Sequence, residues 1–118
     1  MISMRAEIVD MIIHATELYC YYMAPPMEAT FPCIVYNEVV NSDYVVVKGN
    51  EYANLAYSFT IYCEDPMNIL AIAYKIDEVL KCKGFIKDYT SPDMFAEGYY
   101  SKTLRFKAIV NHKGEIFN

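Results

Sequence analysis

The sequence predicts an α+β fold: a mainly antiparallel sheet of about four strands with two helices packed on one face. Apolar residues alternate with period two from Leu55 to Cys63 and again from Tyr100 to Val110, which is typical of strands with one buried face. Between these runs, apolar residues recur at helical spacing after Asp65-Pro66. At 118 residues, the chain is expected to form a single domain over 1–118.

The clearest signals surround the second helix. Asp65 offers a side-chain oxygen to cap the helix, and Pro66 suits the first helical position, where its missing N–H would have no partner. Gly84 can adopt the left-handed conformation that ends a helix. The predicted buried stripe consists of Ile69, Ile72, Ala73, Ile76 and Leu80.

The N-terminal part predicts one helix and two short strands. The helix is expected to start at Ser3, to run to about Tyr22 and to be ended by Pro25-Pro26. Its expected inner stripe contains Ile8, Val9, Ile12, Ile13, Thr16 and Tyr19. A strand over 33–40, a turn at 41–43, a second strand over 44–48 and a polar loop over 48–54 are expected to follow.

The C-terminal part predicts a loop over 87–98, with room for a short extended piece near its start, and then the last strand. The element order is therefore α-β-β-β-α-β. Because the neighbouring strands are linked as hairpins, we expect a largely antiparallel sheet with both helices on the same face.

The charge is acidic and unevenly distributed. The net charge is −5, which disfavours a nucleic-acid binder because such proteins need a basic surface. Residues 1–74 hold 9 acidic and 2 basic side chains, whereas residues 75–118 hold 6 acidic and 8 basic ones. Two interpretations remain open: copies of the chain meet head to tail, or both halves are simply solvated.

No constellation of residues indicates catalysis or ligand chemistry. No nucleophile has a visible base, and no glycine-rich phosphate loop occurs. Glu7, Asp10, His14 and Glu17 would share one helical face, but one helix supplies too few metal ligands, so a solvated face is favoured. We expect no enzyme activity, no cofactor and no metal. The four widely spaced cysteines are expected to be free thiols, and we expect neither a signal peptide nor a membrane-spanning stretch.

The chain is rich in residues that favour protein interfaces, with 12 tyrosines and 7 methionines. Tyr19, Tyr21, Tyr22, Met23 and Met27 crowd the end of the first predicted helix, and they cannot all face inward. An interface and an aromatic rim around the core are both compatible with this pattern.

Four segments in this order resemble the tail terminator (tail completion) proteins of long-tailed bacteriophages and phage-tail-like bacteriocins. Their motifs are a Pro-x-Ile/Val-x-Tyr strand, a Tyr-x-Phe/Ile-x-Ile strand, a helix that ends in Gly-Phe and a closing Lys-x-x-x-Phe strand. The matching segments are Phe31-Pro32-Cys33-Ile34-Val35-Tyr36, Tyr57-Ser58-Phe59-Thr60-Ile61-Tyr62, Gly84-Phe85 and Lys102-Thr103-Leu104-Arg105-Phe106. The resemblance covers nearly the whole chain and rests on the order and spacing of the motifs.

The resemblance implies a structural protein of a virion or phage-tail-like particle, assembled in the bacterial cytoplasm. It implies a homo-hexameric ring that caps the tail tube, stops its polymerisation and offers a surface to a neck or head-completion protein. In a contractile particle the sheath protein would be a further partner, and DNA would only pass through the lumen. The alternatives are a head–tail connector or neck protein and, from another class, a small ligand-binding α+β domain.

The residues expected to contact partners come from the tyrosine-rich segment and the two predicted loops. They are Tyr21, Tyr22, Met23, Lys48, Asn50, Glu51, Tyr52, Tyr89, Asp93, Met94 and Phe95.

Overall fold

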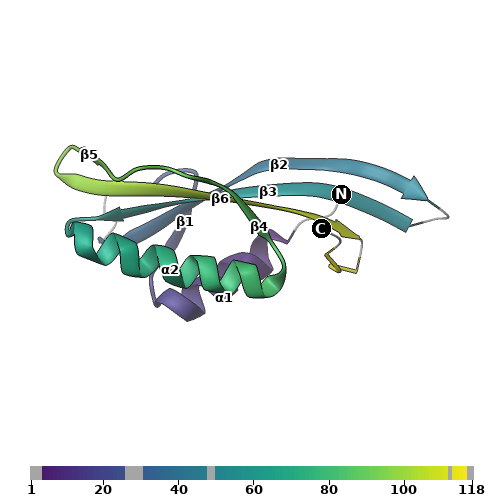
Figure 1. The fold of residues 1–118 in the computed structure, drawn as a ribbon, viewed down its shortest axis with the longest axis horizontal. Coiled ribbons are helices and arrows are strands. Elements are labelled where there is room, and N and C mark those ends of the chain that lie inside the picture. The colour runs from purple at the N-terminus through teal and green to yellow at the C-terminus, as the bar shows by residue number, and fades with distance from the viewer. Residues whose placement is uncertain (1–3, 26–30, 48–49, 112, 117–118) are drawn as a thin grey trace.

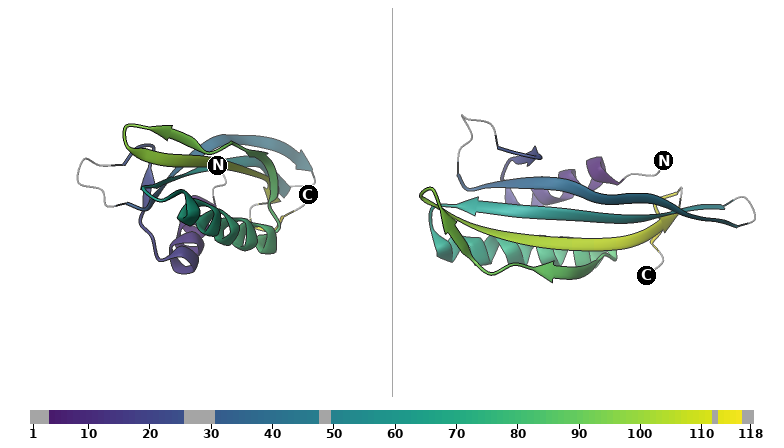
Figure 2. Two further views of the ribbon diagram at one scale, coloured as in Figure 1. Left: turned by 60° about the vertical axis from the view of Figure 1, so that its left-hand side comes forward. Right: turned by 90° about the horizontal axis from the view of Figure 1, so that it is seen from above.

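The protein folds as one mixed sheet with two helices on one of its faces (Figures 1 and 2). The computed structural model describes residues 4–25, 31–47, 50–111 and 113–116, with the backbone alone at 40–47 and 50–51. Its elements are α1 (Arg5–Thr16), β1 (Cys20–Tyr22), β2 (Cys33–Val47), β3 (Asn50–Cys63), α2 (Pro66–Lys83), β4 (Ile86–Thr90), β5 (Met94–Ala96) and β6 (Tyr99–Asn111).

The strands are ordered β1-β2-β3-β6-β4, and β5 also pairs with β6. All pairs are antiparallel except β1 with β2, which is parallel. The α+β class, the largely antiparallel pairing and the placement of both helices on one face are therefore confirmed. The expected four strands are wrong in detail, because the sheet has six.

The second helix forms as its local signals predict. Asp65 Oδ1 accepts a hydrogen bond of 2.9 Å from the backbone N–H of Met67, and Pro66 starts the helix. Gly84 ends it at φ 111°, and its N–H donates to the carbonyl oxygens of Leu80 and Lys81. All five residues of the predicted stripe are buried. The prediction of α2 is confirmed at both ends.

Replacing Asp65 with alanine is expected to lower the free energy of unfolding by about 1 kcal/mol, because the N–H of Met67 loses its acceptor. Chemical denaturation measures this loss. Glu64→Ala, at the exposed neighbouring position, serves as the control and is expected to change stability by less than about 0.5 kcal/mol. Equal effects of the two substitutions would contradict a capping role.

The first helix is shorter than predicted. It ends at Thr16, and Glu17 takes the left-handed conformation (φ 59°) while its N–H donates to the Ile13 carbonyl oxygen over 2.8 Å. The chain then forms β1, because Cys20–Tyr22 find ladder partners on β2, a tertiary contact that outweighs helical periodicity. Tyr19 is accordingly 69% exposed instead of lying on the inner stripe. The predicted cap Ser3 lies outside the described residues.

Strands β2 and β3 replace the predicted turn at 41–43 and the polar loop at 48–54. Asn41, Ser42 and Asp43 pair with Leu55, Asn54 and Ala53 within one continuous hairpin. Two register shifts, between Glu38 and Val40 and between Asp43 and Val46, accommodate these residues of low strand propensity. The ladder extends to the pair Val47–Asn50, and this hairpin reaches well beyond the helices (Figure 1).

The predicted loop over 87–98 is mostly extended. It contains most of β4 and all of β5, which pair with β6 at separate positions along its length. Glu97 and Gly98, at φ 55° and 88°, turn the chain from β5 into β6. The last strand is confirmed and runs one residue further at each end than predicted.

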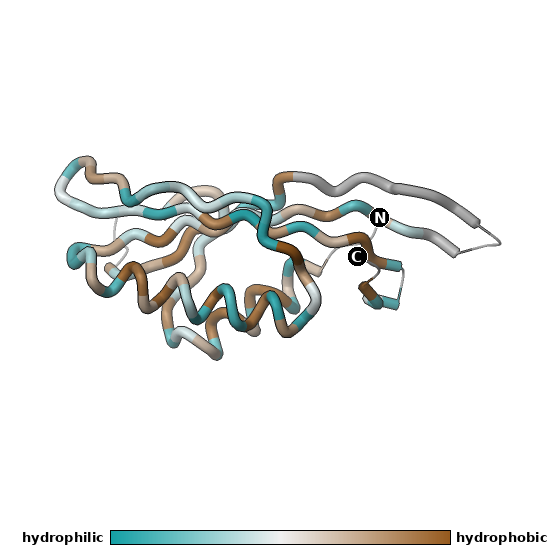
Figure 3. Tube along the Cα trace, in the orientation of Figure 1, coloured by the Kyte–Doolittle hydropathy of each residue, from teal (hydrophilic) through white to brown (hydrophobic). Residues whose placement is uncertain are grey.

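The core lies between the helices and one face of the sheet. Ile8 and Ile12 of α1 and the stripe of α2 cover Tyr57, Phe59 and Phe106, which are at most 1% exposed. Figure 3 shows hydrophobic positions recurring along the helices and the strands above them. The Tyr57 hydroxyl accepts a hydrogen bond of 3.0 Å from the N–H of Met4, which fixes the start of α1 to β3. Both described helices lie on this side, and the part of the chain that the structure describes places no helix on the opposite face of the sheet (Figure 2).

Candidate functional site

Exposed apolar side chains gather at one edge of the sheet, beside β1. Tyr19, Tyr22 and Met23 are 69%, 47% and 66% exposed, and we refer to these three residues as the β1 edge surface. The ring of Tyr22 lies 5.3 Å from that of Tyr36, and the Arg5 guanidinium carbon lies 4.8 Å from the Tyr22 ring centroid. These contacts hold Tyr22 in place while nearly half of it stays exposed.

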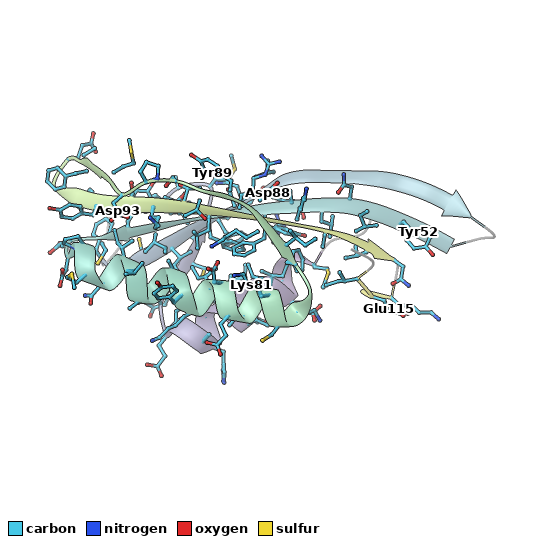
Figure 4. The ribbon with its side chains drawn as sticks, viewed as in Figure 1. Tyr52, Lys81, Asp88, Tyr89, Asp93 and Glu115 are labelled. Atoms are coloured by element: carbon cyan, nitrogen blue, oxygen red, sulfur yellow. The ribbon has the colours of Figure 1, made fainter. Side chains whose placement is uncertain are left out.

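A second group lies at the other edge of the sheet. Ile86, Tyr89, Met94 and Phe95 are 47%, 52%, 56% and 63% exposed, and we refer to them as the β4–β5 edge surface. The Phe95 ring packs at 4.7 Å from the half-buried Tyr100 ring, which positions it on the short β5–β6 hairpin. Figure 4 shows Tyr89 near Asp88, on the side of the sheet formed by β4.

The strand order places these two surfaces on opposite sides of the molecule. Strand β1 is one outer strand and β4 is the other, with β2, β3 and β6 between them. The two surfaces therefore cannot meet within one chain, but they can meet between successive copies. Tyrosine, phenylalanine and methionine are residues that recur in such interfaces.

The edges themselves discourage strand addition. Strands β1 and β5 have three residues each, and β4 contains a register shift beside Lys87. Short strands, bulges and edge lysines are common protections against uncontrolled edge pairing. Contact through side chains is thus favoured over a continuous intermolecular sheet.

The uneven charge of the sequence is only partly separated among the elements. The basic residues of 75–118 are divided among α2, which carries Lys75, Lys81 and Lys83, the strands β4 and β6, and the turn after β6. Several of those basic groups already have partners: Lys87 with Asp77 at 2.8 Å, Lys102 with Asp93 at 3.0 Å and Arg105 with Asp88 at 3.5 Å. These ion pairs within the subunit leave fewer unpaired charges for contacts between copies.

The residues predicted from the sequence divide among three places. Tyr22 and Met23 lie on the β1 edge surface, with Tyr21 half-buried beside them and its ring 6.2 Å from that of Tyr19. Tyr89, Met94 and Phe95 lie on the β4–β5 edge surface, next to the ion-paired Asp93.

The remaining predicted residues belong to the β2–β3 hairpin. Tyr52 is half-buried opposite Asn111, and Asn50 and Glu51 begin β3 with side chains outside the description. Lys48 lies outside the described residues.

Sequence reasoning missed seven exposed apolar residues. Ile13 and Tyr19 were assigned to the inner face of the first helix, but Ile13 is 38% exposed and Tyr19 lies beyond the end of that helix, and Val39 and Ile86 were not placed on any surface. Met67, Leu70 and Tyr74 are 78%, 51% and 65% exposed on the outer face of α2. Their spacing of three and four residues, opposite the buried stripe, is the signal that could have found them.

A groove of about 790 Å³ runs between α1 and α2. Met11, Ala15, Val79 and Cys82 give it an apolar lining, and the charged or polar side chains along it are Asp10, His14, Lys75 and Glu78. The predicted polar face of α1 is interrupted, because Glu17 has left the helix. Among the described residues, no group of three or more histidine, cysteine or acidic side chains is placed to hold a metal ion.

The four cysteines are free thiols, and they differ in exposure. Cys33 and Cys63 are buried, while Cys82 is exposed. Burial, together with the neighbouring Cys33, raises the pKa of the Cys20 thiol to about 12, and burial also raises the pKa of Cys33. Cys82 is therefore the thiol that an alkylating reagent can reach readily at pH 8.

Comparison with known proteins identifies no family for this chain. No protein-family model matches the chain, and no curated protein matches it. None of the helices in the described part of the chain is long and apolar enough to cross a membrane.

Proposed function

We propose that this protein is a structural subunit of a phage tail or phage-tail-like particle, a tail terminator that closes into a ring on the end of the tail tube. The observation that carries the proposal is the pair of exposed apolar surfaces at opposite edges of one sheet. The sequence motifs follow one another in the order found in the tail terminator family, and this resemblance indicates a tail tube as the partner of the ring.

Two different surfaces on opposite sides favour a head-to-tail contact. Such a contact repeats from copy to copy and produces a closed ring when the rotation between neighbours divides the circle evenly. Six copies per ring is the number that the family resemblance implies. The β1 edge surface belongs to the acidic residues 1–74 and the β4–β5 edge surface to residues 75–118, in which basic side chains slightly outnumber acidic ones, so the contact would not bring two acidic parts together.

The shape of the subunit suggests how the ring meets its partners. The molecule measures 52 × 25 × 23 Å, and the β2–β3 hairpin and the β5–β6 hairpin lie at opposite ends of its long axis (Figure 1). If that axis runs parallel to the tube, one hairpin faces the tube protein and the other faces the neck or head-completion protein. A sheath protein would contact the outside of the ring, and DNA would pass through its lumen.

The test is the mass of the protein in solution, measured over a concentration series with and without purified tail tubes. We expect a hexamer, or a smaller species that forms rings on tube ends and halts tube growth. A monomer that ignores tube ends at every concentration would exclude the terminator function. A hexamer that binds isolated neck proteins but leaves tube growth unchanged would favour the head–tail connector instead.

A further inference from the structure

The outer face of the helix layer is a third exposed surface, separate from both edges. It consists of Met67, Leu70 and Tyr74 on α2 together with the groove between α1 and α2. On an α-helix these three positions follow one another along one side, and Val79 and Cys82 of the groove lie beside that side. We call this whole surface the helix-layer face. Figure 4 shows Lys81, which also lies on α2.

The helix-layer face is electrically balanced in an otherwise acidic protein. Asp10, Glu78 and Lys75 line its groove, and Lys81 is exposed on α2 with 59% of its side chain accessible. Two acidic and two basic side chains therefore lie on this face, whereas the whole chain has a net charge of −5. Two copies of an acidic protein can approach each other through such a face with no net local repulsion.

The charges are also arranged for contact with an identical surface. The groove is lined by the basic Lys75 and by the acidic Asp10 and Glu78. One surface therefore carries both positive and negative charges around an apolar lining. In a two-fold contact each patch meets its own copy, and a patch with both signs can pair basic groups with acidic ones in both directions. The helix-layer face has no excess of either charge, so it would not attract a strongly basic or a strongly acidic partner.

We infer that the helix-layer face binds the helix-layer face of a second copy about a two-fold axis. Tyr74, Leu70 and Met67 of one copy then cover the groove of the other. The inference goes beyond the proposed ring, since it uses neither edge surface.

The size of the face sets the expected strength. Helix α2 is about 27 Å long, and two helices packed about 10 Å apart present a face of roughly 500 Å² per copy. A standard stable interface buries about 800 Å² per partner. The contact is therefore a weak one that depends on protein concentration.

The experiment separates this contact from the ring by using the full-length Phe95→Asp variant, which removes one edge surface. Sedimentation over a concentration series is expected to show a monomer–dimer equilibrium. Adding Tyr74→Asp is expected to weaken the dimer at least tenfold. Tyr74 is 65% exposed, so its replacement leaves the core unchanged. A Phe95→Asp variant that stays monomeric, or a dimer that Tyr74→Asp leaves unchanged, would overturn the inference.

Charge reversal provides a second readout in the same background. Glu78→Lys lowers the net negative charge of the protein, so a general charge effect would strengthen association. A two-fold contact through this face predicts the opposite, because two surfaces with excess positive charge would then meet. The double variant Lys75→Glu/Glu78→Lys restores the balance and is expected to restore the dimer. A tighter dimer with Glu78→Lys alone would also overturn the inference.

Cys82 reports on the groove directly. Its alkylation by iodoacetamide at pH 8 is expected to slow as the concentration of the Phe95→Asp variant rises, and to stay fast when Tyr74→Asp is added. The other thiols contribute little signal, since Cys33 and Cys63 are buried and the pKa of Cys20 is near 12. Failure of the ring and failure of this contact remain distinguishable. The ring is assayed with the wild-type protein on tube ends, whereas this contact is assayed with the Phe95→Asp variant in solution.

Discussion

Replacing Phe106 with alanine is expected to lower the free energy of unfolding by about 3–5 kcal/mol. Phe106 is fully buried in the central strand β6, opposite Tyr57, and its ring lies 6.3 Å from that of Phe59. Truncation leaves a cavity between the sheet and the helix layer, among neighbours that are themselves buried. For a domain with a typical stability of about 5–15 kcal/mol, this loss is a large fraction of the total.

Urea denaturation followed by circular dichroism measures the effect. Lys107→Ala, one residue further along β6, is the matched control because Lys107 is exposed on the face without helices. It is expected to change stability by less than about 0.5 kcal/mol. A loss below about 1 kcal/mol for Phe106→Ala would mean that this face of the sheet is not the core.

Replacing Phe95 with aspartate is expected to abolish ring formation while leaving the fold intact. Phe95 is 63% exposed on the β4–β5 edge surface, so its loss costs little within the subunit. At a head-to-tail contact, a charge would replace an aromatic anchor, and such anchors typically contribute about 2–4 kcal/mol each. Each contact would weaken by about thirtyfold or more. Tyr74→Asp is the matched control, because Tyr74 is 65% exposed and lies away from both edges.

Mixing two variants tests whether the contact is head to tail. Met23→Asp is expected to disable the β1 edge surface, where Met23 is 66% exposed at a left-handed φ of 69° that aspartate tolerates. Neither variant should form rings alone. With Tyr74→Asp added to both variants to remove the helix-layer contact, a mixture retains one intact pair of edge surfaces and should therefore produce heterodimers and no larger species. Rings in the mixture, or rings of either variant alone, would contradict the proposed contact.

The parts of the fold that could be predicted are those with local causes. Asp65, Pro66 and Gly84 each act within one turn of α2, so its bounds followed from the sequence. The end of α1 and the course of β2 depend on distant partners instead. Cys20–Tyr22 form a strand only because β2 lies beside them, and Asn41–Asp43 stay extended because residues 53–55 pair with them.

The candidate surfaces were predictable in composition but not in arrangement. The crowding of tyrosine and methionine pointed to Tyr22 and Met23, and the predicted loop over 87–98 pointed to Tyr89, Met94 and Phe95, all of which are substantially exposed. Their division between opposite edges depends on the strand order, in which β6 separates β3 from β4. That order has no local signature, since it is decided by which strands cover the helices best.

The central position of β6 also determines when the fold can form during synthesis. Strands β4 and β5 leave the ribosome before β6, yet β6 is the strand with which both of them pair. Strand β3 likewise has one side open until β6 arrives. A nascent chain that has not yet supplied residues 99–111 holds exposed ladder edges and an open core. Folding to the native sheet is therefore delayed until late in translation, and partial chains are the species that chaperones must protect.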